Sequence, residues 1–185
     1  IGESVGQYKI TKHLGSGGMG DVYLAVDSKL ERRVALKFLP QRFAKDTDAL
    51  QRFQREAKAL AALNHPNIVT VFDVGEHNGV PYFAMEYLEG QSIKDLIAAG
   101  KLSMEDSLEI TAQIAEGLAE AHNAHIVHRD IKSENLIRLA NGRAKIMDFG
   151  LATWRGVVHV TQEGSTVGTM AYMSPEQSQG MKIDQ

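Results

Sequence analysis

The sequence contains no cysteine among its 185 residues. This absence excludes a disulfide framework, a zinc–thiolate site and a cysteine nucleophile. Disulfide bonds are rare in the reducing cytoplasm, so a chain without cysteine fits that compartment. A cytoplasmic location is therefore our expectation for this segment.

Long apolar runs are also missing, because none approaches the roughly 18–20 residues that a membrane-spanning helix requires. No signal peptide is visible. The chain opens on Ile1 rather than Met, which leaves room for a membrane anchor elsewhere in a longer parent protein. We expect no membrane contact by the segment itself.

Charge of one sign is not in excess, since the net charge is −3. Such a chain lacks the basic surface that attracts nucleic acids and anionic membranes. Its short Lys/Arg clusters are mixed with acids, as is typical of solvated faces. We therefore expect no nucleic-acid partner, and no internal repeat indicates an array architecture.

The residues that are present follow the patterns of a folded domain, with 43% hydrophobic residues. A chain of this length buries about 70% of the surface that its unfolded form exposes. The first part is rich in strand-type segments, and the part after Gly90 is mainly helical. The expected strands cover residues 8–14, 22–26, 33–39, 68–74 and 80–86. We place the boundary between two lobes so that they span residues 1–88 and 89–185.

Two longer segments have helical spacing of apolar residues. Residues 46–63 form the first, with polar residues between the apolar ones. The second begins at Ser103, where Glu105 and Asp106 are favourable at the positive end of the helix dipole. Its expected face consists of Leu108, Thr111, Ala112, Ala115, Leu118, Ala119 and His122.

A glycine-rich motif, G-x-G-x-x-G-x-V, lies between the first two expected strands. Glycines let the backbone approach phosphate oxygens and point its N–H groups at them. A flexible hairpin is the plainer interpretation. A dinucleotide-binding fingerprint requires a helix directly after the glycines, whereas residues 22–26 indicate a strand. The motif comprises Gly15, Ser16, Gly17, Gly18, Met19, Gly20 and Val22.

Lys37 ends the segment Val-Ala-Leu-Lys, and an isolated lysine on a strand is usually a solvated edge residue. A cation near a glycine-rich loop could instead hold two phosphate groups. Glu56, in the first expected helix, could pair with Lys37 and fix its ammonium group.

The octapeptide His-Arg-Asp-Ile-Lys-Ser-Glu-Asn at residues 128–135 is a more specific signal. Asp130 could accept a hydroxyl proton, while Asn135 could offer an oxygen to a metal ion. Asp148 begins Asp-Phe-Gly thirteen residues later and offers a carboxylate that suits Mg²⁺.

Taken in order, these motifs and Ser-Pro-Glu at residues 174–176 resemble the signature set of protein kinases over essentially the whole chain. The glycine motif is most similar to those of bacterial serine/threonine kinases of the eukaryotic (Hanks) type. The resemblance implies an α+β, two-lobed protein-kinase fold. Its first lobe would hold a five-stranded antiparallel sheet with the C helix, and its helical second lobe would be incomplete.

The resemblance also assigns roles for ATP-dependent phosphorylation of protein serine and threonine hydroxyls. Lys37, paired with Glu56, would hold the α- and β-phosphates, and Asp130 would accept the hydroxyl proton near Lys132. Asn135 and Asp148 would bind two Mg²⁺ ions, with Mn²⁺ as an alternative metal. Adenine would contact Leu14, Val22, Ala35 and Leu136, with Met85 as gatekeeper and the backbones of Glu86 and Leu88 as hinge.

Two further implications concern specificity and regulation. Lys132 and Thr169 match the choice of serine/threonine kinases, so tyrosine specificity is not expected. Arg129 could order a phosphorylated activation segment. Thr161, Ser165 and Thr166 are the candidate sites, phosphorylated by another copy of the kinase.

The largest departure from the family pattern is length, because kinase domains run to roughly 250–280 residues. We therefore expect a domain cut short, with apolar faces exposed through which copies would self-associate. The alternative to an active kinase is a catalytically inert ATP-binding fragment or scaffold module.

Overall fold

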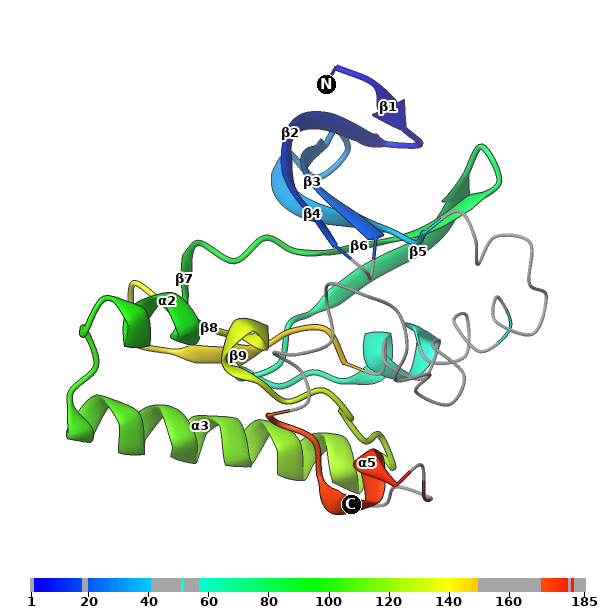
Figure 1. Ribbon diagram of the computed structural model, residues 1–185. Helices are drawn as coiled ribbons and strands as arrows, with labels where there is room; N and C mark the ends of the chain where they lie inside the picture. The colour runs from blue at the N-terminus through cyan, green and yellow to red at the C-terminus, as the bar shows by residue number, and fades with distance from the viewer. Residues whose placement is uncertain are drawn as a thin grey trace. The chain divides into compact units, whose positions relative to one another are not determined.

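The computed structural model describes residues 2–17, 20–40, 51, 57–149, 171–179 and 181 (Figure 1). The chain divides into two compact units, each described here by itself. The first unit contains residues 1–62 and 70–87, and the second contains residues 63–69 and 88–185. Residues 63–69 lie within the expected first lobe but pack with the second unit. Several predicted site residues fall outside the described ranges: Gly18, Met19, Glu56, Thr161, Ser165, Thr166 and Thr169.

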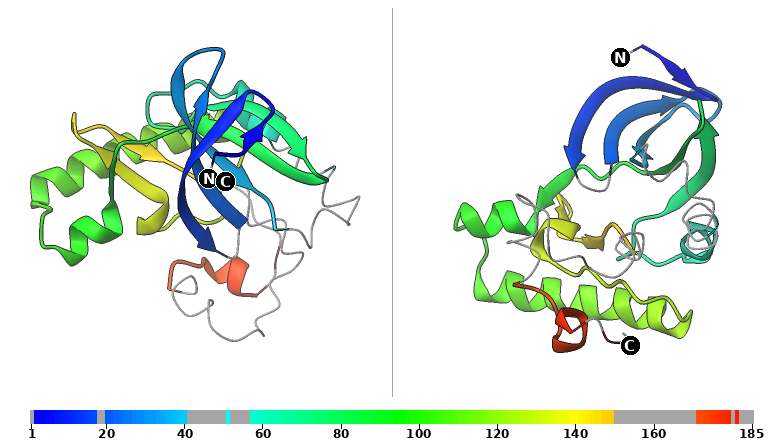
Figure 2. Two further views of the ribbon diagram at one scale, coloured as in Figure 1. Left: turned by 90° about the horizontal axis from the view of Figure 1, so that it is seen from above. Right: turned by 45° about the vertical axis from the view of Figure 1, so that its right-hand side comes forward.

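The first unit is built on one antiparallel sheet of six strands in the order β1-β2-β3-β4-β6-β5. Its strands curl strongly in the views of Figure 2. Five of them correspond to the expected five-stranded sheet, and the two-residue β1 adds a sixth at the edge. The strands are β1 Ser4–Val5, β2 Tyr8–Gly17, β3 Gly20–Asp27, β4 Arg32–Phe38, β5 Val71–His77 and β6 Val80–Glu86.

One face of this sheet carries the core of the first unit. Tyr8 is 2% exposed, and its hydroxyl donates to Oδ2 of Asp73 over 3.0 Å. Burial and the neighbouring Asp73 carboxylate raise the pKa of Tyr8 well above its ordinary value, so the phenol keeps its proton. The apolar members are Val5, Ile10, Ala25, Val34, Leu36 and Ala84, packed with Tyr82.

The described part of the segment 46–63 is helical at residues 51 and 57–62. Ala57 and Leu60 are buried, as the helical spacing of apolar residues requires. The remainder of the expected C helix lies outside the described residues.

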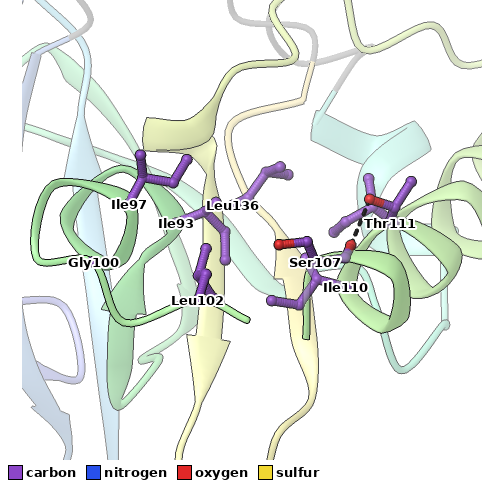
Figure 3. A pocket seen from close by; sticks show the side chains of 9 residues that line it. Ile93, Ile97, Gly100, Leu102, Ser107, Ile110, Thr111 and Leu136 are labelled. Atoms are coloured by element: carbon purple, nitrogen blue, oxygen red, sulfur yellow. Dashed lines mark hydrogen bonds between the residues drawn. The ribbon is translucent and has the colours of Figure 1, made fainter. Parts of the chain in front are cut away.

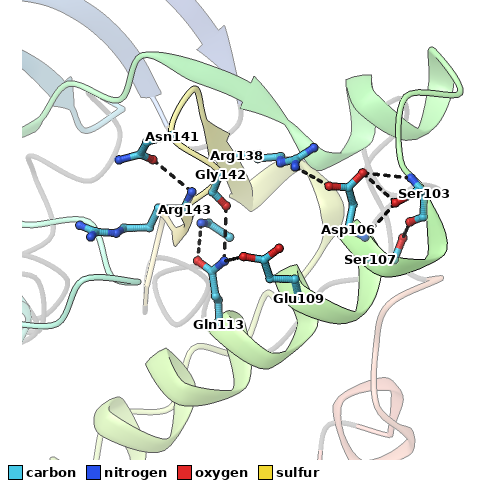
Figure 4. Close-up of polar contacts among 10 residues, drawn as sticks. Ser103, Asp106, Ser107, Glu109, Gln113, Arg138, Asn141, Gly142 and Arg143 are labelled. Atoms are coloured by element: carbon cyan, nitrogen blue, oxygen red, sulfur yellow. Dashed lines mark hydrogen bonds and ion pairs between the residues drawn. The ribbon is translucent and has the colours of Figure 1, made fainter.

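The second unit combines helices with a small three-stranded antiparallel sheet in the order β7-β8-β9. Ser103 caps the long helix α3, which begins where the sequence indicated. A capping box joins the side chains of Ser103 and Asp106 to the backbone. Arg138 of β8 also pairs with Asp106 (Figure 4). The elements are β7 Gly90–Ser92, α2 Ile93–Ala98, α3 Met104–Asn123, η2 Ser133–Asn135, β8 Leu136–Leu139, β9 Ala144–Ile146 and α5 Pro175–Ser178.

The apolar face that the sequence indicated for α3 is not the face that is buried in this unit. Leu108 is 65% exposed, and the other expected residues are exposed or only half-buried. The buried stripe is Ile110, Ile114, Gly117 and Ala121. A Cβ atom at Gly117 would lie 3.1 Å from Cδ1 of Ile146 and 3.3 Å from Asn67, so this glycine permits close packing of the helix. Within the described residues, no helix is both long and apolar enough to cross a bilayer.

A polar network ties α3 to residues 63–69 and to the β8–β9 hairpin. Asn67 is 4% exposed and donates to Oε1 of Gln113 over 2.9 Å and to the carbonyl of Ala144 over 2.8 Å. The backbone N–H of Ala144 donates to the same Oε1 over 2.7 Å, and Gln113 also reaches the carbonyl of Gly142 (Figure 4). Because buried polar groups need partners, this network fixes the hairpin that carries the candidate site.

Candidate active site

The predicted phosphate-binding and adenine-binding residues of the first unit lie on adjacent strands. Val22 of β3 pairs with Lys37 of β4, and Ala35 of β4 pairs with Met85 of β6. Side chains alternate along a strand, so Val22, Ala35 and Lys37 share one face of the sheet. Gly15 pairs with Val22 and brings the glycine motif to the same place. Residues from four strands, β2, β3, β4 and β6, thus lie side by side in the sheet.

Lys37 is 3% exposed, which is unusual for a lysine. A buried ammonium group requires polar partners. Its predicted partner Glu56 lies outside the described residues, so the Lys37–Glu56 pair stays a prediction. Burial in the middle of the sheet contradicts the simpler interpretation of Lys37 as a solvated edge residue.

The last glycine of the motif is required by its surroundings. Gly20 has φ of +105°, a conformation that side chains disfavour, and a Cβ atom there would lie 1.8 Å from the carbonyl oxygen of Phe38. Strand β3 therefore begins with its backbone close to β4. By contrast, Leu14, expected above adenine, is 39% exposed in this unit.

The second unit brings together Asp130, Lys132 and Asn135. Nζ of Lys132 lies 2.9 Å from Oδ2 of Asp130. Nδ2 of Asn135 donates to the carbonyl oxygen of Asp130 over 2.7 Å and to Oδ2 over 3.2 Å. Asp130 and Asn135 are buried, at 7% and 5% exposed, so these contacts have little competition from water. A carboxylate held in this way can accept a proton in a defined direction.

His128 connects the loop that carries Asp130 to the segment after β9. Its Nδ1 accepts from the backbone N–H of Asp130 over 3.2 Å, and its Nε2 lies 2.8 Å from the carbonyl of Met147. Burial lowers the pKa of His128, which favours a neutral ring. A neutral ring with its proton on Nε2 satisfies both bonds. The ring also packs on Phe149, with 4.5 Å between centroids.

The two predicted metal ligands flank the β8–β9 hairpin, with Asn135 directly before β8 and Asp148 two residues after β9. Leu136 and Ile146 are paired, and the backbone N–H of Met147 donates to the carbonyl of Asn135 over 2.8 Å. Asp148 follows with φ of +59°, a left-handed conformation, and Phe149 is 1% exposed. The buried Phe149 anchors the turn on which Asp148 sits.

The donor set of Asn135 and Asp148 fits a hard divalent cation. Both hydrogen bonds donated by the Asn135 amide nitrogen go to Asp130, so its oxygen Oδ1 is directed away from that residue. Within the described ranges, no three His, Cys, Asp or Glu side chains gather in a way that could hold a metal ion.

Two contacts of the loop that carries Asp130 were not anticipated from the sequence. Nε2 of Gln177 donates to the carbonyl of Arg129 over 2.6 Å, and Tyr172 shares a hydrogen bond of 3.0 Å with Ser133. Gln177 also forms a capping box with Ser174 at the start of α5. The sequence signal was Ser-x-x-Gln at residues 174–177, a capping-box pattern. Residues 171–179 are thus held against the loop.

A pocket of about 480 Å³ lies within the second unit, between α2, the following loop, α3 and β8 (Figure 3). Leu136, the residue expected below adenine, lines it together with Ile93, Ile97, Leu102 and Ile110. The hydroxyl groups of Ser107 and Thr111 donate to helix carbonyls, so the wall is effectively apolar. Leu136 therefore contributes to an apolar pocket within the second unit.

Comparisons with known proteins agree with this geometry. Residues 8–185 match the family described as protein kinase domain. The chain is 43% identical over 182 residues to serine/threonine-protein kinase PrkC of Bacillus subtilis, covering 97% of this chain and 28% of PrkC. It is 40% identical over 186 residues to serine/threonine-protein kinase PknB of Mycobacterium leprae, covering 96% of this chain and 30% of PknB. The chain thus spans less than a third of either relative.

A solved structure gives the same picture at the level of the fold. The crystal structure of the Mycobacterium tuberculosis PknI kinase domain superposes with a TM-score of 0.79 and 30% sequence identity, covering 99% of this chain and 69% of that one. This chain contains the ordered motifs, a strand that carries Lys37 and a loop that carries Asp130. On the family match and these similarities, the chain belongs to the protein kinase family and has the protein-kinase fold.

Proposed function

We propose that this chain transfers the γ-phosphoryl group of ATP to serine or threonine hydroxyls of protein substrates. The observation that carries the proposal is the cluster in which Lys132 and Asn135 both contact Oδ2 of Asp130. The relatives named as serine/threonine-protein kinases support it. Phosphoryl transfer needs mainly positioning and charge stabilisation, which such a cluster supplies.

Asp130 is the proton acceptor in this proposal. The substrate hydroxyl oxygen forms a bond to the γ-phosphorus while the bond from that phosphorus to the bridging oxygen of ADP breaks. The hydroxyl proton passes to the carboxylate of Asp130. Lys132, held 2.9 Å from that carboxylate, fixes its orientation and offers positive charge to the transferring phosphoryl group. Asn135 holds the opposite side of the same residue through its amide nitrogen.

ATP contacts are assigned to residues of both units. In the first unit, Lys37 holds the α- and β-phosphates, the glycine motif covers the phosphates, and the Glu86 backbone contributes to the hinge. In the second unit, Leu88 and Leu136 complete the adenine contacts. Family membership implies ATP and a divalent metal. We assign Mg²⁺, with Mn²⁺ as an alternative, to Asn135 and Asp148, where it would neutralise charge on the phosphate oxygens.

Regulation and context extend the proposal. Thr161, Ser165 and Thr166 stay the candidate autophosphorylation sites, and Arg129 the candidate phosphate partner. We also propose that the segment works in the cytoplasm, where ATP and protein substrates meet. Self-association of the segment stays a prediction that light scattering can test.

The direct test is incubation of the chain with Mg-ATP and a generic basic acceptor protein, followed by mass spectrometry. We expect phosphate incorporation that is lost in Asp130→Asn and in Lys37→Ala. Mapping the sites would also show whether any falls between residues 149 and 176. ATP binding without incorporation would contradict the proposal and favour the inert ATP-binding or scaffold alternative.

A further inference from the structure

Three polar side chains form a cluster at the glycine-rich end of the β2–β3 hairpin. Ser16 donates to Oδ1 of Asp21 on the opposite strand and shares a hydrogen bond of 3.0 Å with Nε2 of His13. The same Nε2 lies 3.6 Å from Oδ1 of Asp21. The His13 ring packs against Tyr23, with 5.0 Å between centroids.

A β-bulge explains how His13 reaches this cluster. In a regular strand, residues three apart point to opposite faces, so His13 and Ser16 should lie on different sides of the sheet. The register of β2 against β3 shifts between His13 and Gly15. One extra residue in β2 restores the two side chains to the same face. The bulge therefore serves to bring a third group onto the Ser16–Asp21 pair.

The cluster lies on the face of the sheet opposite to Lys37. Asp21 and Tyr23 alternate with Val22 along β3, and Val22 pairs with Lys37. Interactions on the cluster's face can therefore hold the hairpin without occupying the face assigned to the nucleotide.

The hairpin has few other means of cross-strand attachment at this end. The three residue pairs in register are Gly15 with Val22, Ser16 with Asp21, and Gly17 with Gly20. Of these three, only the pair of Ser16 and Asp21 has a side chain on both strands, and cross-strand side-chain pairs are the unit that stabilises a sheet. Glycines, in addition, lose more conformational freedom on ordering than other residues.

We infer that His13, Ser16 and Asp21 act as a positioning cluster that fixes the phosphate-binding end of the β2–β3 hairpin from the face opposite to Lys37. Ser16 thereby contributes its side chain to the hairpin while its backbone stays available to phosphate oxygens. The functional consequence is tighter ATP binding, so this inference rests on the proposed function. The structural part does not, because it concerns contacts within the hairpin alone.

The experiment compares Ser16→Ala, Ser16→Thr and Thr11→Ala in the full chain. Thr11 is the matched control, because its hydroxyl also bonds across the hairpin, to the carbonyl of Leu24 over 3.1 Å, but far from the glycines. Amide hydrogen exchange of residues 15–17 and 20–22 is measured without nucleotide by NMR. The dissociation constant and KM for Mg-ATP are measured alongside kcat.

Loss of one such hydrogen bond changes an equilibrium constant by a factor of roughly three to ten. We expect Ser16→Ala to speed exchange at these amides and to raise the ATP dissociation constant and KM by about that factor, with a smaller effect on kcat. Ser16→Thr, which keeps the hydroxyl, should restore both values. Asp21→Ala should have a smaller effect in the Ser16→Ala background than alone, because both substitutions remove the Ser16–Asp21 hydrogen bond.

Wild-type exchange rates in Ser16→Ala would overturn the inference, as would an equal effect of Thr11→Ala. Faster exchange with an unchanged ATP dissociation constant would overturn its functional part. Failure of the wild-type chain to bind ATP would instead count against the proposed function, and the exchange comparison would still decide whether the cluster fixes the hairpin.

Discussion

Nζ of Lys132 lies 2.9 Å from Oδ2 of Asp130, and both side chains are largely buried, at 16% and 5% exposed. Asn135 donates to the same oxygen. Both contacts fall on Oδ2, so Oδ1 is the oxygen that we expect to receive the hydroxyl proton. Ion pairs shielded from water are held more firmly than surface pairs, which fits a role in positioning.

Replacing Lys132 tests that relationship. We expect Lys132→Ala to lower kcat by about 10²-fold, because it removes charge stabilisation at the reacting group. The dissociation constant for Mg-ATP should change much less. Steady-state kinetics and calorimetry check the two values. Lys132→Arg keeps the charge and should recover part of kcat; an alanine variant as active as wild type would contradict the assignment.

The pH dependence of stability should reveal His128. Burial lowers its pKa in the folded protein, so the unfolded chain takes up a proton first as the pH falls. The stabilisation by neutral His128 is present above the ordinary histidine value, about 6.5, and is lost as the pH falls from there toward the lower folded value. The difference in free energy of unfolding between wild type and His128→Gln should shrink over that range.

Urea denaturation between pH 5 and 8 measures this difference. His125→Asn is the matched control, because His125 is exposed and has φ of +59°, which asparagine tolerates. Its unfolding free energy should stay parallel to that of wild type. If the difference in free energy of unfolding between wild type and His128→Gln were the same at every pH, His128 would contribute packing alone.

Asn67 should be essential for the stability of the second unit. Asn67→Ala removes the donors to Oε1 of Gln113 and to the carbonyl of Ala144, and Oε1 then keeps only the backbone N–H of Ala144 among the partners described above. We expect a loss of about 1–3 kcal/mol in unfolding free energy. Thermal or urea unfolding measures it. The exposed Asn123 is the control, and Asn123→Ala should change stability by less than about 0.5 kcal/mol.

Gly20 offers a test of backbone geometry at the phosphate-binding hairpin. Gly20→Ala combines a positive φ with a clash against the carbonyl of Phe38. We therefore expect the free energy of unfolding to fall by about 1–3 kcal/mol and ATP binding to weaken. Gly79→Ala separates the two effects, because Gly79 has φ of +76° with nothing near its missing Cβ. The free energy of unfolding of that variant should fall by about 1 kcal/mol or less, and its ATP affinity should stay unchanged. Equal losses in the two variants would rule out the clash.

Much of the fold followed from local sequence. Strand β6 coincides with the expected residues 80–86, and Ser103 caps α3, the helix that was expected to begin at Ser103. Alternating or β-branched residues and cap residues act over a few positions, so they are visible without tertiary structure. The ordered motifs led to the kinase family, which the family match confirms.

The buried face of α3 was not predictable in this way. The residues chosen from apolar spacing, such as Leu108 and Ala112, are exposed. The buried stripe includes Gly117, a residue without apolar surface, because its lack of a side chain lets α3 approach Ile146 and Asn67. Periodicity ranks faces by hydrophobicity, whereas packing selects the face whose shape fits its neighbours.

The sequence by itself determined which residues could carry the chemistry, because Lys37, Asp130, Asn135 and Asp148 sit in motifs whose order and spacing are specific to one family. Tertiary structure decided how those residues are held. It buried Lys37, directed both Lys132 and Asn135 to one oxygen of Asp130, and placed His13 beside Ser16 through a bulge. These relationships depend on register and on contacts between distant segments, which local patterns do not encode.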